Sequence, residues 1–276
     1  MLARLFLLIT MLWAPLAHGQ VNIEKLRTDS GEDGVSGAFS LSTAFSQGNI
    51  DFADFSMGSF VGKKQGKSTT FLIGNGRFAA KRTQGDYLEA PDVDLWDDEA
   101  HFSYNALVHL RSSYELGAKL SVEAYSQYEF NEFLLLDRRI LGGIGLRYTA
   151  YASKRVGLWL GSSAMLEGER LNAEAIADTE EVDQQHWRWS SYGTAKVALN
   201  DANDWLSTVY YQPRFDDFSD YRLMGETGLE FAMSERFSFS VNARLRQDSK
   251  PPQTPDGAAS VLPTDISVNN AIAVKW

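Results

Sequence analysis

The residue types that could carry out catalysis or bind a metal are few in this chain, and their spacing does not match that of a catalytic or metal-binding motif. The chain has no cysteine, which excludes thiol nucleophiles, disulfide frameworks, zinc fingers and iron–sulfur ligation. His101 and Ser103 would share one face of a strand, where they could form a base–nucleophile pair. The orienting residue that such a pair needs would fall near Glu115, in a predicted turn. No His-Glu-x-x-His motif occurs, so we predict no catalytic residue, no metal site and no cofactor.

Charged residues at alternating positions form a more informative set. Arg222, Glu226 and Glu230 recur on one face of a segment, and Arg244 and Arg246 recur on one face of the next. Side chains on neighbouring strands pair across the sheet, so these charges are expected to form ion pairs. Similar inward positions are predicted for a wider set: Arg77, Arg111, Glu123, Glu129, Arg147, Arg188, Lys196 and Arg214. The candidate lining residues are Arg147, Arg214, Arg222, Glu226, Glu230, Arg244 and Arg246.

The elements that must position these charges are β-strands. Phe237, Phe239 and Val241 alternate with Ser238 and Ser240, which is the period of a strand and not of a helix. About twelve such segments follow one another, without a helix of useful length; residues 173–177 could form one turn in a loop. The predicted strands cover 34–46, 50–62, 68–82, 98–112, 119–131, 138–152, 156–171, 185–199, 204–215, 219–233, 236–247 and 265–276. The alternation slips near Asp54, which predicts a bulge there.

A period of two does not say which face points inward. Three features favour a membrane barrel whose apolar face meets lipid: long strands, charges of both signs well inside them, and aromatic residues near their ends, such as Trp187, Trp205 and Phe237. We therefore predict an all-β chain that forms a single transmembrane antiparallel up-and-down β-barrel. The connections between the predicted strands alternate between two sets. All those of one set are short, and the three long ones, 83–97, 172–184 and 248–264, belong to the other set. This is the pattern of short periplasmic turns and longer extracellular loops.

The long connections are acidic. Seven acids and no base lie between Thr83 and Glu99, and further acids occur in 172–184 and 215–220. These loops could bind divalent cations at a lipopolysaccharide surface, or they could simply form a solvated acidic surface; no calcium-binding loop motif is present. The formal net charge of −10 and the isoelectric point near 4.9 argue against nucleic-acid binding, which needs clustered bases.

The first residues are typical of a secretory signal peptide. Arg4 precedes the apolar run Leu5–Leu16, and Ala17-His18-Gly19 offers a cleavage site before Gln20. The expected organisation is a signal peptide over 1–19, a periplasmic segment over 20–33 and a barrel over 34–276. After residue 20 no apolar run is long enough for a membrane-spanning helix. The expected location is the outer membrane of a Gram-negative bacterium, in contact with membrane lipid and lipopolysaccharide.

Several motifs, in order, resemble one family. They are the opening Val21–Arg27, the turn Ser46–Asn49, the run Asp137–Tyr148, the segment Asp217–Arg222, and Asp248–Pro252 followed by Thr264-Asp265. This arrangement is similar to the domain of unknown function 481 family, whose members are described as salt-induced outer-membrane proteins. The resemblance implies an outer-membrane barrel but carries over no site residues. The terminal Trp276 resembles the C-terminal signal that the barrel-assembly machinery reads.

These observations predict a small-solute channel, or an envelope component linked to salt or osmotic stress. A structural barrel whose lumen is closed by salt bridges, without transport, is the alternative. A membrane-embedded hydrolase is a third interpretation, which the missing orienting residue disfavours.

Overall fold

The structure is a computed structural model that describes residues 33–47, 50–83, 101–234, 237–255 and 261–275. The predicted signal peptide, most of the segment 20–33 and Trp276 lie outside the described residues. The strands are β1 (Gly34–Ser46), β2 (Ile50–Gln65), β3 (Ser68–Thr83), β4 (His101–Glu115), β5 (Leu120–Asn131), β6 (Leu136–Ala152), β7 (Val156–Leu171), β8 (Asp183–Ala198), β9 (Asn203–Pro213), β10 (Tyr221–Ala232), β11 (Phe237–Asp248) and β12 (Thr264–Lys275). A 3-10 helix, η2 (Glu132–Leu134), follows β5. No helix among the described residues is long and apolar enough to span a membrane.

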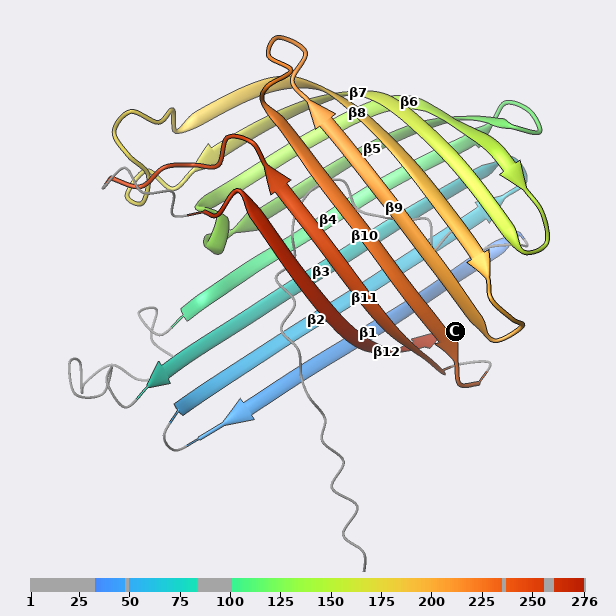
Figure 1. The fold of residues 1–276 in the computed structure, drawn as a ribbon, viewed down its shortest axis with the longest axis horizontal. Helices are drawn as coiled ribbons and strands as arrows, with labels where there is room; N and C mark the ends of the chain where they lie inside the picture. Colours follow the sequence, from blue (N-terminus) through green and yellow to red (C-terminus); the bar gives the residue numbers. More distant parts are fainter. Residues whose placement is uncertain (1–32, 48–49, 84–100, 235–236, 256–260, 276) are drawn as a thin grey trace, which may run out of the picture.

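The strands form one closed antiparallel barrel, shown in Figure 1. Each strand pairs with its neighbours in the sequence, and β1 pairs with β12 through Ala38↔Lys275 and Phe39↔Val274. This confirms the predicted up-and-down barrel of about twelve strands, whose limits differ from those expected by only a few residues.

The alternation along each strand decides which side chains enter the lumen. On β4, His109 and Arg111 are fully buried inside the barrel, whereas Tyr104, Val108 and Leu110 remain 50, 49 and 43 % exposed on its outer wall. A water-soluble barrel would turn these apolar side chains inward. Their exposure round the barrel gives an outer wall suited to lipid, which is the architecture of outer-membrane β-barrels.

The connections sort into two rims, as expected. The turns after β2, β4, β6, β8 and β10 are short; Gly66, in the left-handed region at φ 56°, makes the tightest of them, between β2 and β3. The longer connections follow β3, β7 and β11 at the opposite rim, which we call the long-loop rim. Residues 172–182 belong to this rim, as do residues 249–255 and 261–263, so these segments can meet above the lumen.

Two local expectations have different outcomes. The bulge predicted near Asp54 is wrong, because β2 pairs with β3 without a shift from Ile50↔Thr83 to Gln65↔Ser68. Asp54 instead forms a 2.7 Å ion pair with the buried Arg77 of β3. The turn expected over 173–177 is present, since the carbonyl of Asn172 accepts hydrogen bonds from the backbone N–H groups of Ala175 and Ile176.

Candidate functional site at the mouth of the lumen

A cavity of about 250 Å³ lies at the long-loop rim of the lumen, and we call it the mouth cavity. Its lining combines guanidinium groups, carboxylates and a few apolar side chains. The lining residues are Leu134, Leu136, Arg139, Glu169, Leu171, Glu180, Glu181, Gln184, His186, Arg188, Arg214, Asp220, Arg222, Arg246, Asp248, Lys250 and Pro252. Most of the charges come from inward positions near the strand ends of β6, β7, β8, β10 and β11, where alternation directs them into the lumen.

Arg222 is the centre of an ion-pair network below this cavity. Its guanidinium contacts Glu167 at 2.6 Å and Glu169 at 2.9 Å, both on β7. It also contacts Asp248 on β11 at 3.1 Å. Strands β8 and β9 separate β7 from β10 in the wall, so the contacts with Glu167 and Glu169 cross the lumen instead of following its wall.

Two further arginines extend the network. Arg188 of β8 contacts Glu167 at 2.9 Å and Asp220 at 3.0 Å. Arg139 of β6 contacts Glu129 of β5 at 2.8 Å and also donates to Glu169. These eight residues, Glu129, Arg139, Glu167, Glu169, Arg188, Asp220, Arg222 and Asp248, are called the mouth network below.

The mouth network is shielded from water. Glu129 and Glu167 are 0 and 1 % exposed, and Arg188 is 2 % exposed. Burying such charges is unfavourable unless each is paired and hydrogen-bonded, and removing one partner of a buried pair is strongly destabilising. Glu167, Glu169, Asp220 and Asp248 each contact at least two arginines. Because the arginines share these carboxylates, the loss of any one arginine removes an ion-pair partner from several carboxylates.

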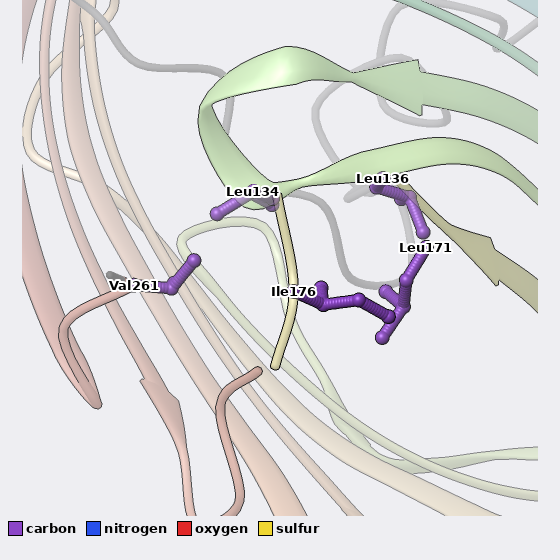
Figure 2. Close-up of a cluster of buried hydrophobic side chains, with 5 residues drawn as sticks. All are labelled: Leu134, Leu136, Leu171, Ile176 and Val261. Carbon is purple, nitrogen blue, oxygen red and sulfur yellow. The ribbon is translucent and has the colours of Figure 1, made fainter. Parts of the chain in front are cut away.

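Apolar side chains cover one side of the mouth cavity. Figure 2 shows Leu134 and Leu136 from the β5–β6 turn, Leu171 and Ile176 from the end of β7 and its loop, and Val261 from the segment before β12, which form one buried cluster. The two long segments are also linked directly, because the backbone N–H of Ala177 donates to the carbonyl of Gln253 at 2.8 Å. We call the described parts of these segments, 172–182, 249–255 and 261–263, the cap.

A second layer fills the middle of the lumen. Tyr192 of β8 reaches across to donate a 2.9 Å hydrogen bond to Glu123 of β5, and Tyr125 of β5 bonds Ser163 of β7 at 2.9 Å. Both rings lie over glycines: a Cβ at Gly143 would meet the Tyr125 ring at 2.4 Å, and one at Gly161 would meet the Tyr192 ring at 2.0 Å.

Arg111 completes this middle layer. Its guanidinium lies over the Tyr125 ring at 4.8 Å and faces Glu123 at 3.5 Å. The side chain is 0 % exposed, as is that of His109 beside it. These contacts pack the part of the lumen that lies next to β4, β5, β7 and β8.

Comparison with protein families gives one match. The family model described as "Protein of unknown function, DUF481" matches residues 41–265. The chain belongs to this family. The match runs from within β1 to the start of β12. No curated protein matches the sequence of this DUF481 chain.

Solved barrels resemble this DUF481 chain in fold at very low identity. The NanC porin aligns with a TM-score of 0.45 and 9 % identity over 87 % of this chain and 97 % of its own. The translocator domain of the autotransporter NalP from Neisseria meningitidis gives 0.45 and 8 % over 92 % of both chains. The anion-selective porin from Comamonas acidovorans gives 0.39 and 8 %, over 88 % of this chain and 99 % of the porin. These likenesses concern the fold alone.

The lining residues predicted from the sequence fall into two groups. Arg214, Arg222 and Arg246 lie together at the mouth cavity. Arg147, Glu226, Glu230 and Arg244 lie deeper, toward the short turns; Arg244 pairs with Glu226 at 3.4 Å, and the Arg147 guanidinium stacks 5.0 Å from the Trp159 ring.

Of the acids in the mouth network, Glu129 was predicted to point inward, whereas Glu167 and Glu169 were missed. Glu167 and Glu169 occupy alternate positions of β7 and face Arg222 across the lumen, but the sequence analysis weighed only pairs between adjacent strands. Arg139 was also missed, although its partners Glu129 and Glu169 lie directly opposite it on the adjacent strands β5 and β7. The sequence did contain a sign that Glu167 and Glu169 point inward, because they share one face of a strand with the buried Leu171.

In the acidic loop 214–220, carboxylates form ion pairs with the chain's own cations. Arg214 lowers the pKa of Asp216 to about 2 through its hydrogen bonds, and Lys250 and Ser219 hold the pKa of Asp217 well below its usual range. Within the described residues, no group of three or more His, Asp or Glu side chains could hold a metal ion. The acidic segment between β3 and β4 lies outside them, and so do the side chains of His101 and Ser103.

Proposed function

We propose that this DUF481 chain is an outer-membrane β-barrel that acts as a narrow, normally closed passage for small solutes. The outward apolar wall and the two unequal rims support the outer-membrane location. The expected contact with the barrel-assembly machinery through Trp276 belongs to the same proposal.

One observation carries the proposal: Arg222 of the mouth network reaches across the lumen from β10 to bind Glu167 and Glu169 of β7. A dry apolar core would close a barrel permanently. Here the closing groups are ion pairs and hydrogen bonds next to a 250 Å³ cavity, and water or a charged solute could replace their contacts when the cap moves. The alternative is a structural barrel in which the same network closes the lumen without transport.

Conductance across a planar bilayer separates the two. The wild-type protein should show rare openings, and Arg222→Ala should open more often, because it removes the cation that links β7, β10 and β11. A double variant, Ala177→Cys with Gln253→Cys, should close further on oxidation, since the two backbones are hydrogen-bonded at 2.8 Å and the chain has no other cysteine. The reduced form of the same variant is its control. If folded barrels of every variant stay silent, the passage is refuted and the structural alternative stands.

The proposed link with salt or osmotic stress depends on the family resemblance. It is tested by growth of a deletion strain at raised salt, with complementation by the wild-type gene. Unchanged growth across the salt range would remove the link and leave the passage proposal intact.

A further inference from the structure

The outer wall of the barrel carries a groove that the lumen does not explain. It has a volume of about 530 Å³ and lies on β6, β7 and β8. Small residues of β7, Ser162 and Ala164, form its floor, and Ile144 and Leu146 of β6 form one side. Ile144 and Leu146 are 62 and 50 % exposed, so this surface faces the membrane. We call it the wall groove.

Aromatic side chains close the groove on the side of β8. Trp189 is fixed there, because its indole N–H donates a 2.8 Å hydrogen bond to the Ser162 hydroxyl. Phe218, from the loop between β9 and β10, packs edge-on against Trp189 with ring centroids 6.5 Å apart, and Phe215 also lines the groove. The loop straddles the rim, since its Arg214 and Asp220 face the mouth cavity.

Two arginines stand at the long-loop rim of the same two strands. Arg138 of β6 and Arg170 of β7 are direct register partners. Like charges opposite each other repel, and Asp183 compensates them only weakly, at 3.9 and 3.7 Å. The two side chains remain 53 and 47 % exposed, so a guanidinium pair on the outer face is available to an external anion.

The arginine pair and the groove lie on one continuous path. Positions 138, 140, 142 and 144 of β6 all point outward, and the outward residues between the arginines and the groove are the apolar or small Ile140, Gly142, Leu166 and Gly168. Six residues from Arg138 to Ile144 span about 20 Å along the strand, or about 15 Å along the membrane normal at the usual tilt. This is about the depth of one leaflet of a hydrocarbon core some 30 Å thick.

We propose that β6, β7 and β8 form a binding site for lipid A of the outer leaflet, with its phosphates at Arg138 and Arg170 and an acyl chain in the wall groove. A phosphate accepts bidentate hydrogen bonds from guanidinium groups. From the rim inward, the arginine pair and the wall groove follow in the same order as the anionic head group and the apolar acyl chains of lipid A. The groove lies at the middle of β6 and β7, and Phe215 and Phe218 connect it to the long-loop rim, where outer-leaflet lipid is found. This inference depends on the proposed outer-membrane location but not on the passage, so a silent conductance result leaves it untouched.

Native mass spectrometry of protein purified from outer membranes in mild detergent tests the site. The wild-type barrel should retain lipid A in preference to phospholipid. Arg138→Gln with Arg170→Gln should lower retention about five- to thirtyfold, as expected for two partly exposed charged contacts. Ala164→Trp should lower it independently, because the indole fills the groove.

Two matched controls separate the site from general effects. Lys154→Gln with Arg155→Gln removes the same charge from the short-turn rim, and Val108→Trp adds an indole to the exposed wall of β4. Both controls should retain lipid A at the wild-type level. Three results would each overturn the site. They are wild-type retention of lipid A in the test variants, a loss of lipid A in the controls as large as in the test variants, and retention of phospholipid in place of lipid A. Resistance to detergent at room temperature shows whether each variant barrel has folded. If one test variant does not fold, the other is sufficient to test the site.

Discussion

Replacing Arg222 by Met tests whether the mouth network behaves as a coupled unit. The substitution removes a cation that contacts Glu167, Glu169 and Asp248 at 2.6, 2.9 and 3.1 Å. Glu167 keeps Arg188 at 2.9 Å, and Asp248 keeps Arg246 at 3.5 Å. The free energy of unfolding should therefore fall by about 3 kcal/mol, the low end of the range for breaking a buried ion pair.

Urea unfolding in lipid vesicles, followed by tryptophan fluorescence, measures the change. Arg244→Met is the control, because its pair with Glu226 is longer, at 3.4 Å, and both side chains are about one-fifth exposed, at 22 and 21 %; it should cost at most about 1 kcal/mol. In a double-mutant cycle with Glu167→Gln, the two substitutions should couple by about 1 to 3 kcal/mol. If Arg222→Met costs no more than the control and the cycle is additive, the network does not hold the barrel as described.

Two further predictions concern the middle layer and the loop acids. Gly161→Ala should lower the free energy of unfolding by about 1 to 3 kcal/mol, because its Cβ would lie 2.0 Å from the ring that crosses the lumen; Gly193→Ala, with its nearest contact at 3.6 Å, is the control, and equal loss in both would contradict the packing described. The carboxyl of Asp216 should titrate near pH 2 in an NMR experiment, and Arg214→Gln should return its pKa toward the usual value near 3.9. Since the folded pKa is lowered, the stabilisation is complete above pH 4 or so and is lost as the pH falls through about 2; an ordinary pKa in the wild-type protein would exclude the ion pair.

The sequence allowed the wall of the barrel to be predicted more fully than its interior. A period of two identifies strands and their two faces without any knowledge of tertiary structure, and the lengths of the connections assign the rims. The bulge near Asp54 was predicted wrongly because Phe52 shares the face of Asp54, so an apolar residue interrupts a polar face. Continuous pairing with β3 and the contact with Arg77 outweigh this local irregularity.

The interior could be predicted only in part. Arg222 and Arg246 were found because they recur on inward faces, and the Arg244–Glu226 pair follows from adjacent strands in register. The contacts of Arg222 with Glu167 and Glu169 join strands that are not adjacent. Whether such side chains meet depends on the width and cross-section of the lumen, which the alternation of a single strand does not encode.

The pairing of β1 with β12 has a consequence for assembly. Every other strand pair in the described barrel joins elements that follow each other in the chain, so each can form by local hairpin closure. The β1–β12 pair joins the two ends of the domain, and its described contacts are Ala38↔Lys275 and Phe39↔Val274. Pairs of such long sequence separation carry the largest loop-closure entropy and form late. We therefore expect the β1–β12 seam to be the last strand pair to form when the barrel folds.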